Sequence, residues 1–115
     1  MIMEYNVNFI FSDDSLPRFI KDQVAKDFMK MRSKAVDLLN PRFAEWNASY
    51  TEPVNGEDDM VYNAYISEKE NGILQEFNKQ YNGSLELYAD EYGDIAGKFK
   101  LFNQEYTIHM TLEPI

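Results

Sequence analysis

The sequence predicts a single α+β domain over residues 1–115, in which one long amphipathic helix packs on one face of an antiparallel sheet of about five to six strands. Two kinds of periodicity lead to this prediction. One stretch of about 24 residues repeats its apolar positions with the period of a helix. Several short stretches alternate apolar and polar residues, as half-buried strands do, and turn-rich segments separate them.

The N-terminal third contains the two clearest elements. Residues Met3–Phe11 alternate strictly, which predicts a strand. Ser12–Ser15 then offers side-chain oxygens that can cap a helix, and the Asn40-Pro41 pair ends that helix. The apolar stripe of the helix consists of Leu16, Ile20, Val24, Phe28, Met31, Ala35, Leu38 and Leu39.

The middle of the chain is less regular. Residues Phe43–Tyr50 and Met60–Ile66 both alternate, so we expect two strands that form a hairpin, with the polar loop Glu52–Asp59 at its tip. Residues 72–81 carry conflicting signals, because a helical apolar stripe is flanked by two Asn-Gly pairs that are typical of hairpin turns. We expect a short helix of about ten residues that starts near Gly72, and a strand is the alternative.

The last third predicts an antiparallel meander. Its strands are Leu85–Ala89, Ile95–Phe102 and Tyr106–Leu112, with tight turns between them. The predicted order is therefore β-α-β-β-(α)-β-β-β. This order is compatible with a ferredoxin-like variant, or with a cystatin-like sheet curved around one helix if residues 72–81 form a strand.

Composition excludes several classes of protein. The chain has no cysteine, which excludes a disulfide framework and a thiolate nucleophile and suits a reducing compartment. Hydrophobic residues make up 44% of the chain and aromatic residues 15%, too much for a disordered protein. The N-terminus lacks the features of a signal peptide, and no apolar run reaches membrane-spanning length, so we expect a cytoplasmic protein without membrane contact.

Charge is distributed unevenly along the sequence. The net charge is −9, from 20 acidic and 11 basic residues. Residues 18–42 carry a net +4, mainly on one face of the long helix, whereas residues 43–97 carry a net −10. The acidic residues form two clusters, Glu57-Asp58-Asp59 in the predicted hairpin tip and Asp90-Glu91 with Asp94 in the meander turn.

These observations predict a non-enzymatic interaction protein that binds a basic surface of a partner protein. An acidic surface attracts such a partner and repels nucleic acid, so we expect no direct nucleic-acid binding. Such a protein would mimic nucleic acid and occlude a nucleic-acid-binding surface. In composition alone it resembles immunity proteins, nuclease inhibitors and counter-defence proteins of phages or mobile elements. The expected partner-binding residues are the two acidic clusters with an apolar anchor on the outer sheet face, namely Glu57, Asp58, Asp59, Asp90, Glu91, Asp94, Val61 and Tyr65.

Other functions have weaker support in the sequence. The acidic turn lacks the alternating oxygen ligands of a calcium loop, and no cofactor motif is present, so we expect neither a metal nor a cofactor. The alternative function is a small-molecule-binding or catalytic domain that uses the sheet face around Tyr88, Phe102 and His109. The charge asymmetry also permits a homodimer, in which the basic helix face of one copy meets the acidic half of another.

Overall fold

The computed structural model describes residues 4–51, 59–81 and 83–115, and it confirms the α+β class. The described chain contains four strands and three α-helices, two of which are long. In chain order the elements are β1 (Tyr5–Phe11), α1 (Arg18–Leu39), the 3₁₀ turn η1 (Asn40–Arg42), α2 (Phe43–Ser49), α3 (Asp59–Asn78), β2 (Glu86–Ala89), β3 (Ile95–Leu101) and β4 (Gln104–Pro114).

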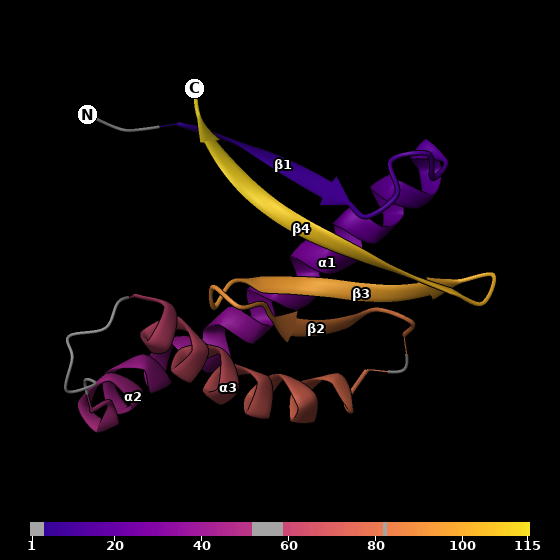
Figure 1. Ribbon diagram of the computed structural model, residues 1–115. Helices are drawn as coiled ribbons and strands as arrows, with labels where there is room; N and C mark the ends of the chain where they lie inside the picture. Colours follow the sequence, from indigo (N-terminus) through magenta and orange to yellow (C-terminus); the bar gives the residue numbers. More distant parts are fainter. Residues whose placement is uncertain (1–3, 52–58, 82) are drawn as a thin grey trace.

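The four strands form one sheet in the order β1-β4-β3-β2, and each neighbouring pair is antiparallel (Figure 1). The predicted strands at the two ends of the chain and in the meander are thus confirmed. Because β1 pairs with the last strand and lies beside no parallel neighbour, the predicted ferredoxin-like arrangement is wrong. The strand alternative for residues 72–81, on which the cystatin-like arrangement depended, is also wrong, because α3 continues through most of this segment.

Two predicted strands in the middle of the chain are helical instead. Residues 43–49 form α2, and residues 60–66 belong to the first half of α3, so the predicted hairpin does not exist. A stretch of seven or eight residues with several small or aromatic side chains fits the period of a helix and that of a strand equally well. The tertiary contacts of the stretch then decide which structure it adopts. Phe43 and Trp46, three residues apart, pack edge to face at 5.3 Å between ring centroids, which requires a helical turn.

Helix α1 confirms the most strongly periodic prediction, with Phe28, Met31, Ala35 and Leu39 buried in the core. The helix crosses behind the sheet in Figure 1. Phe28 is completely buried and approaches β3 at Gly97, where a Cβ atom would lie 3.2 Å from the Phe28 ring and 2.9 Å from Ile108. The glycine therefore permits the close contact between helix and sheet.

Helix α3 lies along the edge of the sheet formed by β2, and two asparagines seven residues apart join it to that strand. Asn71 donates to the Ala89 carbonyl at 3.1 Å and accepts from the Ala89 N–H at 2.8 Å. Asn78 makes the same pair of bonds with Leu87, at 2.8 and 2.9 Å. The two side-chain amides thus take the place of a further strand and satisfy the outward backbone groups of β2.

Replacement of either asparagine tests how much these amide pairs contribute. Asn71→Ala and Asn78→Ala each leave a backbone N–H and C=O of a buried residue without a partner, so we expect a loss of about 2 kcal/mol in the free energy of unfolding for each. Urea denaturation measures it. Asn63→Ala is the control, because Asn63 is half-buried on α3 but makes no side-chain hydrogen bond within the described residues. Equal effects of all three variants would contradict this role.

The turn between β3 and β4 contains an unusual backbone conformation. Leu101 pairs with Gln104, and the two residues between them have positive φ angles, 51° at Phe102 and 66° at Asn103. Such a two-residue turn matches the twist of the hairpin, but the left-handed conformation is unfavourable for a bulky residue. The Phe102 side chain is 91% exposed, so little burial offsets this cost.

A pair of variants at Phe102 separates backbone strain from side-chain contacts. Phe102→Gly removes the Cβ atom that disfavours the left-handed conformation, and we expect it to raise the free energy of unfolding by about 1 kcal/mol. Phe102→Ala keeps the Cβ atom and should bring no such gain. Thermal and urea denaturation of the two variants measure the difference, and a Gly variant no more stable than the Ala variant would refute the strain.

Candidate functional site

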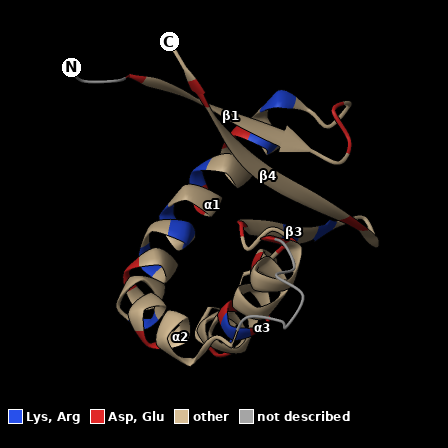
Figure 2. Ribbon diagram, turned by 60° about the vertical axis from the view of Figure 1, so that its left-hand side comes forward, with Lys and Arg blue, Asp and Glu red and all other residues tan. Residues whose placement is uncertain are grey.

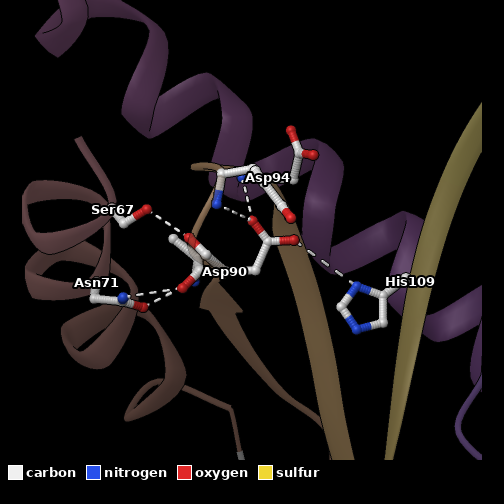
Figure 3. A network of polar contacts seen from close by, with 7 residues as sticks. Ser67, Asn71, Asp90, Asp94 and His109 are labelled. Atoms are coloured by element: carbon white, nitrogen blue, oxygen red, sulfur yellow. Dashed lines mark hydrogen bonds and ion pairs between the residues drawn. The ribbon is translucent and has the colours of Figure 1, made fainter. Parts of the chain in front are cut away.

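The turn between β2 and β3 is an acidic feature whose backbone is held by several hydrogen bonds. Asp90 organises it, because its Oδ1 atom accepts hydrogen bonds from the N–H groups of Tyr92 at 2.9 Å and Asp94 at 3.0 Å. Gly93 supplies the positive φ angle of 82° that closes the turn. Ser67 of α3 donates its hydroxyl to the Asp90 carbonyl, so the turn is attached to the helix (Figure 3).

A buried carboxyl group lies beneath this turn. Glu70 of α3 is only 2% exposed, and its Oε1 atom has no hydrogen-bond partner within the described residues. That atom lies 3.2 Å from the position of a Cβ atom on Gly93, so a side chain there would make a tight contact with it. Burial, followed by the charges of Asp94 and Asp90, raises the pKa of Glu70 to about 7.

His109 lies on the other side of Asp90. Its Nδ1 atom is 3.9 Å from Asp90 Oδ2, and its ring packs edge to face on Tyr88 at 6.4 Å between centroids. The same burial that brings Tyr88 against His109, with the nearby charges of Asp90 and Glu105, raises the pKa of Tyr88. Figure 3 shows His109 coming from β4 and Asp90 from the turn. The β2–β3 turn and β4, two segments distant in sequence, therefore meet at this point.

The predicted acidic residues have different positions and roles. Asp90, Glu91 and Asp94 share the β2–β3 turn, as predicted, and the last two are exposed. Asp90 is half-buried, and its carboxyl is occupied by the turn. Asp59 is exposed at the start of α3 rather than in a hairpin tip, and a negative charge there is favourable for a helix N-terminus. Glu57 and Asp58 lie outside the described residues.

The predicted apolar anchor is not on the outer face of the sheet. Val61 and Tyr65 belong to α3, where Val61 is exposed and Tyr65 is half-buried. The Tyr65 hydroxyl donates to the Trp46 carbonyl at 3.1 Å, and its ring packs on Tyr50. Tyr65 therefore joins α3 to α2, and this part of the prediction is wrong because the segment is a helix.

The alternative site is brought together only in part. Tyr88 and His109 are in contact, but Phe102 lies at the tip of the β3–β4 hairpin, six residues along β3 from the position opposite His109. Two neighbouring rings on the sheet face therefore remain of the predicted three.

The sequence contained a signal for Glu70 that the prediction did not use. Glu70 lies four residues after Ile66 and four before Leu74, so it falls within the apolar stripe of a continuous helix. The signal was hidden because the segment was divided into a strand and a later helix. The seven-residue spacing of Asn71 and Asn78, two helical turns, was hidden for the same reason.

Figure 2 shows how charge is arranged on the fold. Lys and Arg residues lie along α1, whereas the acidic turn lies at the end of β2 and β3 beside α3. Within the described residues, no cluster of three or more His, Asp or Glu side chains has the geometry to hold a metal ion. Nor does any described helix combine the length and apolar character needed to cross a bilayer.

Comparison with known proteins adds no relative. No protein-family model, curated protein or solved structure matches the chain. The candidate site is therefore defined by its geometry alone. Glu91 and Asp94 present exposed carboxylates on a turn that α3 holds through Ser67, and the buried carboxyl group of Glu70 lies beneath the turn.

The raised pKa of Glu70 makes stability depend on pH. The folded protein holds this proton up to about pH 7, whereas the unfolded chain releases it near 4.5. The contribution of this proton to the free energy of unfolding is therefore complete below pH 4.5 and is lost as pH rises through 7. The loss is about 3 kcal/mol, because each unit of pKa shift corresponds to about 1.4 kcal/mol. Glu70→Gln should remove most of this pH dependence and stabilise the protein at pH 8.

Urea denaturation between pH 5 and 8 measures the effect. Glu68→Gln is the matched control, because Glu68 is exposed on the same helix and should leave the pH profile of the parent unchanged. A Glu70→Gln profile that is parallel to the parent profile would show that Glu70 is already ionised at neutral pH.

Proposed function

We propose that this chain is a cytoplasmic interaction protein that occludes a basic, nucleic-acid-binding surface of a partner protein. Its contact region is the acidic end, which we define as the turn residues Asp90, Glu91 and Asp94 together with Asp59 and the neighbouring Glu57 and Asp58. This function is that of an inhibitor, an immunity protein or a counter-defence protein. It involves no catalytic step by this chain.

The observation that carries the proposal is the rigid presentation of the turn. The backbone of the turn is bonded internally, with the Asp90 N–H donating to the Asp94 carbonyl at 2.9 Å, and α3 holds it through Ser67. Glu91 and Asp94 therefore project from a fixed support. A charged surface that is already ordered loses little conformational entropy when a partner binds.

The electrostatics of the acidic end favour a cationic partner. Burial raises the pKa of Glu70, and the nearby charges of Asp94 and Asp90 raise it further. A Lys or Arg placed against Asp94 would lower the pKa of Glu70 and offset part of this repulsion. Binding near neutral pH would then release a proton from Glu70. Long-range attraction between the acidic end and a basic surface also accelerates encounter.

Charge reversal at the turn tests the function. We expect the immobilised protein to capture basic nucleic-acid-binding proteins from a lysate at about 0.05 M salt and to lose them at about 0.5 M. The double variant Glu91→Lys/Asp94→Lys should capture at least tenfold less, on the order of 1.4 kcal/mol or more. The purified parent protein should also displace nucleic acid from the captured partner.

The control is Asp37→Lys/Glu113→Lys, which changes the net charge by the same amount at exposed positions on α1 and β4. This variant should still capture the same proteins. If the two double variants lose capture equally, net charge rather than the acidic end is responsible. If neither loses it, or if the captured proteins keep their nucleic acid, the proposal is wrong.

A further inference from the structure

The two edges of the sheet are treated differently. The edge of β2 is closed by Asn71 and Asn78 of α3, which bond its outward backbone groups. The other edge is β1, which pairs with β4 on one side only. Figure 1 shows this strand at the border of the sheet. An open edge of this kind is a template for another strand.

The direction of the backbone groups of β1 follows from its register. Ser12 donates its N–H to Thr107, and Ile115 donates to Glu4, so the even-numbered residues of this segment bond to β4. The N–H and C=O groups of Val7, Phe9 and Phe11 therefore point away from the sheet. Within the described residues, no hydrogen bond reaches these outward groups.

Strand β1 also lacks the usual protection of an edge. Its seven residues, Tyr-Asn-Val-Asn-Phe-Ile-Phe, include no charged residue and no proline. Five of the twelve exposed large apolar residues in the described chain lie on β1 or at the end of β4, which is a concentration around this edge. They are Tyr5, Val7, Ile10, Leu112 and Ile115.

A groove beside this edge can receive a side chain from an added strand. Its volume is about 330 Å³, and it lies between β1, at Val7, Phe9 and Phe11, and one flank of α1 that includes Arg18 and Ala25. An edge strand with a helix beside it is the geometry in which a further extended segment adds to a sheet. The groove is thus continuous with the unsatisfied backbone groups.

We propose that β1 pairs antiparallel with β1 of a second copy of this chain, about a two-fold axis at Asn8. In this register Val7 of each copy lies opposite Phe9 of the other, so the outward N–H and C=O groups of both strands are satisfied together. The two sheets become one sheet of eight strands. The exposed Val7 side chain of each copy then enters the groove of its partner, beside Ala25.

A second copy fits this edge better than an unrelated extended segment does. A foreign segment would cover one edge and present a new one, whereas two copies remove both open edges in one symmetric contact. The seven residues of each β1 strand carry no charge, so no like charges face each other between the paired strands. The same register brings Glu4 of one copy beside Ser12 of the other, near the charged residues that line the groove, Asp14, Arg18, Lys21 and Asp22.

Oligomeric state tests the pairing. Sedimentation equilibrium from micromolar to submillimolar protein should show a monomer–dimer equilibrium that persists at high salt, because the contact is apolar and backbone-bonded. Val7→Lys places a charge in the contact and should weaken dimerisation at least about tenfold. Val61→Lys is the matched control, since Val61 is 41% exposed on α3 and Val7 is 42% exposed, and it should dimerise as the parent does.

Amide hydrogen exchange on the unmodified protein gives an independent measurement. We expect the N–H groups of Val7, Phe9 and Phe11 to exchange more slowly as the protein concentration rises, while those of the even-numbered residues are already protected by β4. A protein that stays monomeric at every concentration would overturn the proposal. So would a dimer that the Val7→Lys variant still forms, or a dimer whose formation slows exchange at amides other than those of Val7, Phe9 and Phe11. Binding of a basic partner should weaken with salt, so failure of that function and failure of this pairing are distinguishable.

Discussion

The attachment of α3 to the edge of β2 is the interaction on which the rest of the molecule depends. Two asparagine side chains copy the hydrogen-bonding pattern of a backbone and hold the helix antiparallel to the strand. Because their spacing is two helical turns, both amides face the strand at once. This attachment brings Ser67 to the β2–β3 turn and Glu70 beneath it. The position of the acidic turn thus follows from the closed edge.

The same attachment explains why a carboxyl group is buried without a partner. Glu70 lies on the helix face that must turn toward β2, one position before Asn71. Burial there disfavours its charged form, and the carboxylates of the turn above it disfavour the charge further. The molecule therefore combines a fixed acidic surface with a group whose protonation responds to that surface. A positive charge from outside would offset the repulsion between these carboxylates.

Much of the fold was predictable from the sequence. The long periodic segments were predicted correctly, and the short segments in the middle of the chain were not, for a physical reason. Residues 18–39 repeat their apolar positions over six helical turns, which predicts a helix. The strands of the meander alternate apolar and polar residues, and short turn segments separate them, which predicts hairpins. The segments 43–50 and 60–66 are short, and their apolar residues alternate with polar ones although both segments are helical. The Tyr65 hydroxyl of α3 donates to the backbone carbonyl of Trp46 in α2, and a contact between two separate segments of this kind is invisible in a local window. Because both segments were predicted as strands, Val61 was expected on the outer face of a sheet, and the position of Glu70 in the apolar stripe of a helix was not recognised.

The sequence by itself determined the class of the fold, the long helix, the terminal strands and the concentration of acid in residues 43–97, because periodicity and charge are local properties of a chain. It also placed Asp90, Glu91 and Asp94 in one turn. Only the tertiary structure decided that this turn stands on α3, that His109 meets Asp90, and that one sheet edge is closed while the other is open. These features arise between residues distant in sequence, and only three-dimensional packing brings such residues together.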